Sequence, residues 1–213
     1  SYHEDSDIFN RFVLIGYKLI QTWEAYVYHL TCRGGQFQDG IEKVTTDSAF
    51  HLMKNNAARN YIRKWGTFIR NDDYHYPIIP HKYKISFRPI NCNLQWLEFL
   101  EPWCSEIYVP ETFEIGRYWD YVEMESSNTK FELRNRIKIW DKEEFYRSDK
   151  RMSEIPDIFI EFDCQKLNQN NFNIIQNLPQ IIEESAEIGI FELDCFKFYI
   201  TNLNAYEHDL IFV

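Results

Sequence analysis

Two stretches in the last two thirds of this 213-residue chain repeat one plan, in which an extended segment is followed by a helical and then another extended segment. The segments are 83–90, 94–100 and 106–109 in the first stretch, and 157–163, 167–185 and 188–193 in the second. Pro179 interrupts the longer helical segment. A strand–helix–strand unit buries its apolar surface by laying the helix over a sheet, so the repeat predicts strands that share a sheet with helices against it.

Additional extended segments accompany these two units. Strands are predicted at 196–201 and 210–213, and a hairpin is predicted from 118–125 and 131–140 around Ser126-Ser127-Asn128. The predicted fold class is therefore α+β. It consists of a mostly helical N-terminal segment followed by a two-layer α+β sandwich, with a ferredoxin-like arrangement as one option.

The N-terminal third contains two predicted helices. Asp5 or Ser6 can cap the first, and Ile8, Phe12 and Ile15 would form its apolar face before Gly16 ends it. The second is predicted to run from about residues 45–47 to Trp65, with an apolar stripe that includes Tyr61 and Trp65.

Residues 67–82 have a different character, because Pro77, Pro80 and two adjacent aspartates disfavour regular structure. We predict a connector here. The expected organisation is an N-terminal unit of residues 1–66, the connector 67–82, and an α+β domain of residues 83–213.

The composition limits the classes of partner. A formal net charge of −10 argues against a broad nonspecific grip on nucleic acid or on anionic membrane, since both require a positive surface. A local basic patch is still conceivable, although basic residues in the last turns of a helix more often only complement its dipole. The residues of this patch are Arg59, Arg63, Lys64 and Arg70.

The cysteines and the hydrophobic pattern bear on the cellular compartment of the protein. The cysteines are odd in number, widely spaced and form no C-x-x-C pair, so neither a disulfide framework nor a zinc knuckle is indicated. They are Cys32, Cys92, Cys104, Cys164 and Cys195. No apolar run approaches the roughly 18 residues of a membrane span. We expect reduced thiols, no membrane span and a cytoplasmic protein.

Short motifs in the first 66 residues occur in a specific order. His3-Glu4-Asp5-Ser6-Asp7 opens the first helix, and Gly16-Tyr17-Lys18 follows it. A predicted strand at 25–29 ends on His29, and residues 60–66 close the second helix with Lys-Trp-Gly. This order resembles the C-terminal part of the catalytic domain of family 2 glycosyltransferases, which have the GT-A fold. The resemblance covers residues 3–66 and implies that the nucleotide-binding half of such an enzyme precedes them.

The resemblance also implies roles for individual residues. Asp5 would be the general base that accepts the proton of the acceptor hydroxyl, with Glu4 beside it. His29 would lie near the nucleotide diphosphate and its metal ion. The parent enzyme would use Mn²⁺ or Mg²⁺, a nucleotide-sugar donor and a glycan acceptor. The isolated chain lacks the D-x-D-type carboxylates of the upstream half, so we expect it to hold no cofactor and to be inactive alone.

Other interpretations of the same residues exist. Glu4 and Asp5 could simply stabilise a helix start, and His29 could be an ordinary surface or core residue. A rival divalent metal site would use Asp72, Asp73, His75 and His81. The alternative function is a stand-alone module that binds a protein or a glycan without catalysis. In either case, we expect the first helix's apolar face to be covered, by the C-terminal domain or by a second copy in a homodimer.

Overall fold

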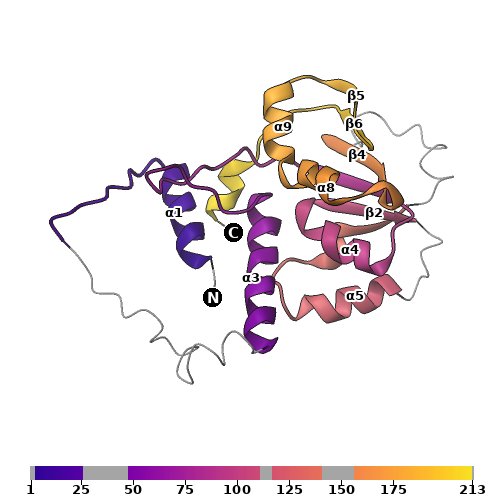
Figure 1. Ribbon diagram of the computed structural model, residues 1–213, viewed down its shortest axis with the longest axis horizontal. Coiled ribbons are helices and arrows are strands. Elements are labelled where there is room, and N and C mark those ends of the chain that lie inside the picture. Colours follow the sequence, from indigo (N-terminus) through magenta and orange to yellow (C-terminus); the bar gives the residue numbers. More distant parts are fainter. Residues whose placement is uncertain (1–2, 26–47, 111–116, 141–155, 213) are drawn as a thin grey trace.

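The computed structural model describes residues 3–25, 48–110, 117–140 and 156–212 (Figure 1). The strands are β1 (Ile85–Ile90), β2 (Glu106–Pro110), β3 (Ile137–Trp140), β4 (Ile158–Asp163), β5 (Gly189–Leu193) and β6 (Phe196–Ile200). The α-helices are α1 (Glu4–Leu14), α3 (Ser48–Trp65), α4 (Leu94–Leu100), α5 (Arg117–Ser126), α6 (Leu133–Arg136), α8 (Gln169–Gln176) and α9 (Leu178–Ser185). The 3-10 helices within the described residues are η2 (Glu101–Trp103), η4 (Cys164–Lys166) and η5 (Glu207–Ile211).

The six strands form one mixed sheet in the order β3-β2-β1-β4-β6-β5. Strands β3, β2, β1 and β4 run parallel to one another, and β6 is antiparallel to both β4 and β5. The predicted α+β class is confirmed. A ferredoxin-like sheet separates the two strands of each β-α-β unit by another strand, whereas β1 and β2 are direct neighbours here. The strand order of this sheet therefore differs from the ferredoxin-like order.

The residues of β4 alternate between the two faces of the sheet. Ile158, Ile160 and Phe162 are buried, and they lie beside the buried residues of β1 and β6 in the register. Phe159 and Glu161 point to the opposite face, where Glu161 pairs with Arg88. Among the described residues, α4, α5, α8 and α9 contribute side chains to the core on the first face, which gives a layer of strands and a layer of helices.

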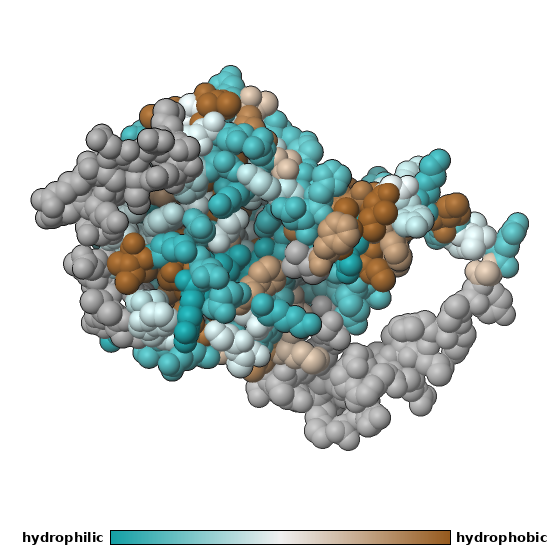
Figure 2. All heavy atoms as spheres, turned by 180° about the vertical axis from the view of Figure 1, so that it is seen from behind, coloured by the Kyte–Doolittle hydropathy of each residue, from teal (hydrophilic) through white to brown (hydrophobic). Residues whose placement is uncertain are grey.

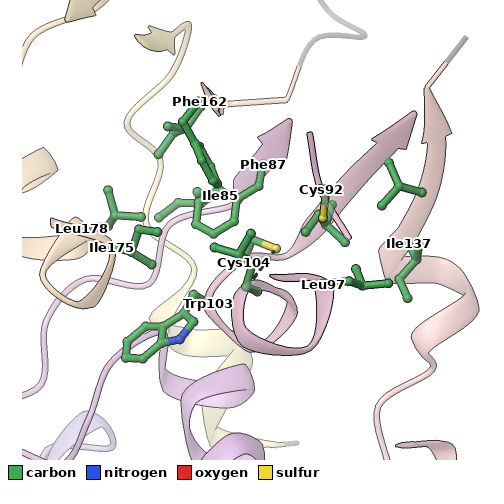
Figure 3. Close-up of a cluster of buried hydrophobic side chains, with 14 of the residues drawn as sticks. Ile85, Phe87, Cys92, Leu97, Trp103, Cys104, Ile137, Phe162, Ile175 and Leu178 are labelled. Carbon is green, nitrogen blue, oxygen red and sulfur yellow. Dashed lines mark hydrogen bonds between the residues drawn. The ribbon is translucent and has the colours of Figure 1, made fainter. Parts of the chain in front are cut away.

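One hydrophobic core joins this face to the helices. Ile85 of β1 faces Ile175 of α8 and Leu178 of α9, and Leu97 of α4 packs into the same cluster (Figure 3). These side chains are all nearly or fully buried. Burying one such side chain contributes roughly 1.5–3 kcal/mol, so this cluster fixes the helices on the sheet.

Most of the predicted elements are present. The helix at 94–100 has the expected bounds, and the segment 167–185 is divided into α8 and α9 at Asn177, just before Pro179. The predicted hairpin is wrong, because residues 117–126 form helix α5 and only β3 is a strand. The predicted strand at 210–213 is also wrong, since residues 207–211 form the 3-10 helix η5.

The N-terminal helices α1 and α3 pack beside the sheet and its covering helices, which we call the sheet domain, and against η5 near the end of the chain. Tyr61 and Trp65 of α3 form a second core cluster with Leu210 of η5, and Leu14 of α1 packs against it. Figure 1 shows η5 returning to lie beside α1 and the end of α3. The last turn of the chain therefore holds α1 and α3 together.

The predicted cover over α1 is not provided by the C-terminal domain. Ile8, Phe12 and Ile15 are 44%, 39% and 52% exposed. Hydrophobic residues gather on the surface over α1 in Figure 2. The buried side of α1 carries Asn10 instead, whose amide donates to the Tyr61 hydroxyl at 2.8 Å. The inner side of α1 is therefore attached to α3 by this polar pair and by the packing of Leu14, while Ile8, Phe12 and Ile15 face outward.

Gly66 ends α3, as predicted. Its φ of +74° lies in the left-handed region, and its N–H donates to the Ile62 carbonyl at 2.7 Å. A Cβ atom at this position would lie 3.3 Å from Lys82 Nζ.

We expect Gly66→Ala to lower the free energy of unfolding by about 1–2 kcal/mol, because alanine disfavours positive φ and its methyl group would crowd Lys82. Chemical denaturation measures the loss. Gly16→Ala is the matched control, since Gly16 has a φ of +92° and open space around its Cβ position. An equal loss for both variants would mean that crowding at Lys82 adds nothing.

Candidate functional site

A cavity of about 570 Å³ lies where α1, α3 and the loop of residues 127–131 meet. We call it the α1–α3 cavity. The start of α1 contributes His3, Glu4 and Asp7. The middle of α3 contributes Ala57, Asn60, Tyr61 and Lys64. Its volume lies within the range of about 300–1,000 Å³ that is usual for small-molecule sites.

The two predicted catalytic carboxylates occupy different positions at this cavity. Glu4 lines it, whereas Asp5 is not among the lining residues. Both side chains are exposed and lie in the first turn of α1, where the helix dipole favours negative charge. Within the described part of the chain, Asp5 makes no hydrogen bond or ion pair. A carboxylate in this state is available to a ligand.

Asp7, the third acid of this turn, has a structural role. Its carboxylate accepts from the indole N–H of Trp65 at 2.9 Å and pairs with Lys64 at 2.8 Å. These contacts attach the start of α1 to the end of α3. They also fix the position of the neighbouring carboxylates relative to the cavity.

His3 precedes α1 in a left-handed conformation, with a φ of +79° and no side-chain cap on the helix. This conformation is uncommon for residues other than glycine, although histidine is enriched in it. The His3 ring lies 5.6 Å from the Tyr61 ring, between centroids. Burial lowers the pKa of His3, so the imidazole is neutral at pH 7. It can both donate and accept a hydrogen bond at the cavity.

Tyr61 forms the inner wall of the cavity. Burial raises the pKa of its hydroxyl to about 12, so the phenol stays protonated, and Asn10 donates to its oxygen. The ring also lies 6.1 Å from the Trp65 ring, between centroids. The wall is therefore a fixed aromatic surface.

A buried ionic network holds α3 against the sheet domain. The side chains of Arg63 and Glu101 are completely buried, and Arg63 Nη2 and Nε lie 2.7 and 2.9 Å from Glu101 Oε2. Arg136 donates to the same carboxylate at 2.6 Å, and Tyr121 donates at 2.9 Å. Glu125 accepts from Arg63 at 2.5 Å.

The charge of Glu101 is set by its partners. Burial alone would raise the pKa of this carboxyl group, but Arg136 and Arg63 outweigh burial and lower it. Glu101 is thus ionised inside the protein. An ionised carboxylate with three hydrogen-bonding partners fixes α3, η2, α5 and α6 relative to one another.

The predicted basic patch is not a free surface. Arg63 is buried in this network, Arg59 donates to Glu125 at 2.9 Å, and Lys64 pairs with Asp7. Arg70 donates to the side chain of Asn177. Each of these four cations is engaged by a partner within the chain.

The rival metal site is not assembled. The Asp72 carboxylate accepts from the backbone N–H groups of Tyr74 and Tyr76 at 2.9 and 2.8 Å, which forms a turn. His81 instead lies between Glu207 and Glu183. The described ranges contain no group of three His, Cys, Asp or Glu side chains placed to hold a metal ion. The predicted metal ligand His29 lies outside these ranges.

The far wall of the cavity was not predicted. Residues 127–131 belong to the loop between α5 and α6, and they bring Asn128, Lys130 and Phe131 to the cavity. The sequence pattern placed a hairpin turn at 126–128, which gave no signal that this loop would face the N-terminal helix. Only the packing of α3 on the sheet domain brings these segments together.

None of the helices in the described ranges is long and apolar enough to cross a membrane. Comparison with protein-family models, with curated proteins and with solved structures finds no significant match for this chain.

Proposed function

We propose that this chain is the C-terminal portion of a nucleotide-sugar-dependent glycosyltransferase of the family 2 type, and that the α1–α3 cavity receives the acceptor. The observation that supports this proposal is the cavity at the acidic start of α1, which Glu4 lines and whose edge Asp5, the next residue of the same helical turn, adjoins in the sequence. Residues 67–213 would then be the connector and an accessory domain.

In the proposed reaction, Asp5 accepts the proton of an acceptor hydroxyl while that oxygen bonds to the anomeric carbon of the donor sugar. The bond between that carbon and the nucleoside diphosphate breaks. Glu4 lies beside Asp5 in the sequence and lines the cavity, where it would hold the acceptor. Stabilisation of the departing diphosphate has to come from the upstream half, so the 213-residue chain alone is expected to be inactive.

The cofactor, the partners and the location belong to the same proposal. The parent enzyme would use Mn²⁺ or Mg²⁺, with His29 as the ligand predicted from this chain. A cytoplasmic enzyme could form a homodimer through Ile8, Phe12 and Ile15, whose exposure leaves an apolar surface available. The alternative is a stand-alone module that binds a protein or a glycan without catalysis, and a protein partner would use the same surface.

The test is sugar transfer with labelled nucleotide sugars, Mn²⁺ and glycan acceptors. The chain is assayed alone and within its complete gene product. Transfer is expected from a longer product that includes the nucleotide-binding half, and Asp5→Asn should slow it by about 10²–10⁴-fold because the base is removed. Asp209→Asn, an exposed acid of η5, is the control. The proposal would be contradicted if neither the chain alone nor the complete gene product transferred sugar, or if Asp5→Asn and the wild type transferred it at equal rates.

A further inference from the structure

The loop of residues 127–131 is held in place before any ligand binds. Asn60 of α3 donates from its side chain to the Asn128 carbonyl at 2.7 Å, and it accepts from Arg63 at 3.0 Å. Arg63 is itself fixed by Glu101 and Glu125. The buried network therefore extends through Asn60 to the cavity wall. A wall fixed in this way loses little conformational entropy when a ligand binds.

Two side chains of this loop are available at the cavity. Lys130 is exposed, and its ammonium group has no partner in the part of the chain that the structure describes. Phe131 is half-buried, with the Arg136 guanidinium 5.6 Å from its ring centroid. Together they offer a mobile hydrogen-bond donor next to a fixed aromatic surface.

The cavity has balanced charge although the chain is strongly acidic. Its charged groups are the carboxylates of Glu4 and Asp7 and the ammonium groups of Lys64 and Lys130, and Asp7 pairs directly with Lys64. His3 adds no charge at pH 7, because burial lowers its pKa. A phosphorylated or otherwise anionic ligand would gain no net attraction here.

The remaining chemistry favours a ligand with hydroxyl groups and apolar C–H faces. Tyr61 and Phe131 provide aromatic carbon, and Asn128, Glu4 and Lys130 provide polar groups. A few polar groups on a mostly apolar lining are typical of a small-molecule site. Uncharged saccharides combine these two surface types.

We propose that the loop of residues 127–131, which the sheet domain contributes, selects the ligand of the α1–α3 cavity, and that this ligand is an uncharged saccharide read by Lys130 and Phe131. The inference rests on the proposed function, because it assigns the acceptor class of the same cavity. It adds that the C-terminal domain is part of the site and determines its specificity.

The test is titration of the full chain with two sets of sugars, followed by calorimetry or by NMR shifts. One set contains uncharged methyl hexopyranosides and disaccharides, and the other contains the same sugars carrying a carboxylate or a phosphate. Lys130→Ala and Phe131→Ala are compared with two matched variants of exposed residues outside the cavity, Lys84→Ala and Phe99→Ala. Thermal melting of each variant confirms folding.

Uncharged sugars are expected to bind more tightly than their charged counterparts. Lys130→Ala and Phe131→Ala should each weaken the preferred sugar by about tenfold, which corresponds to about 1.4 kcal/mol, and should change the ranking within the set. The two control variants should retain the wild-type affinity and ranking. A contact that served only stability would lower the melting temperature and leave the ranking unchanged.

The inference is overturned if no uncharged sugar binds, if the charged set binds better, or if Lys130→Ala and a folded Phe131→Ala rank the sugars as the wild type does. These outcomes are separate from the transfer assay. Loss of transfer in Asp5→Asn together with unaltered sugar ranking in the loop variants would sink only this inference. Selective sugar binding by the chain, without sugar transfer in any form of the protein, would contradict only the proposed glycosyltransferase activity.

Discussion

Replacing Glu101 by alanine is expected to lower the free energy of unfolding by about 3–5 kcal/mol, because it removes the carboxylate that two buried or nearly buried arginines share. Arg63 would be left inside the protein with Glu125 as its remaining carboxylate partner. Chemical denaturation measures the loss, with Glu123→Ala on the exposed side of α5 as the control. A loss below about 1 kcal/mol, the value of an exposed ion pair, would show that the network is not desolvated.

The same carboxylate predicts how stability depends on pH. Arg136 and Arg63 hold the pKa of Glu101 below its ordinary value of 4.5 in the folded protein, against the opposing effect of burial. The contribution of Glu101 is therefore fully present above its unfolded-state pKa and is lost as the pH falls through the lower, folded-state pKa. The unfolding free energy of Glu101→Gln should fall less between pH 5 and acid than that of the wild type. Parallel curves would contradict this.

Replacing Trp65 by alanine is expected to cost about 3–5 kcal/mol and to loosen α1 from the rest of the protein. Trp65 is 1% exposed, packs with Tyr61 and Leu210, and donates its indole N–H to Asp7 at 2.9 Å. Its loss leaves a void and removes a contact that holds the start of α1. The α1–α3 cavity would then lose the wall that carries Glu4.

Hydrogen exchange is the measurement that separates the two effects. Amide protons of residues 4–14 should exchange faster in Trp65→Ala, whereas those of the sheet should follow the global stability only. Trp23→Ala is the control, because Trp23 is 91% exposed. Trp65→Phe should retain most of the packing and lose about 1 kcal/mol through the missing hydrogen bond. Unchanged exchange in residues 4–14 of Trp65→Ala would mean that η5, the Asp7–Lys64 ion pair and the Asn10–Tyr61 hydrogen bond hold α1 without Trp65.

The helix α5 shows why one element was mistaken for a hairpin. Its tyrosines, tryptophan and valine are residues that strands favour, and this preference governed the prediction. The residues that the structure buries are Tyr118, Tyr121, Val122 and Glu125, which recur at i, i+3, i+4 and i+7. That spacing is the helical period, so the signal was present in the sequence and was outweighed by residue preference.

The residues of the candidate site also fall into those that the sequence could identify and those that it could not. Glu4 and Asp5 could be identified from their place at the start of a helix, because that position depends on neighbours in the sequence. Lys130 and Phe131 could not, since they reach the cavity only through the packing of α3 on the sheet domain. The burial of Arg63 was equally hidden, because arginine is mostly exposed and its partners lie 38 and 62 residues away.

The sequence by itself therefore determined the two β-α-β units, the division between α8 and α9, and the acidic start of α1. Each of these depends on the period of apolar residues or on a proline or a helix start, which act over a few neighbouring residues. The tertiary structure alone decided the strand order, the outward turn of Ile8, Phe12 and Ile15, and the joining of three distant segments around one cavity. The physical reason is that these features arise from buried ion pairs and packing between residues far apart in the chain, and no local pattern encodes which partner a side chain will meet.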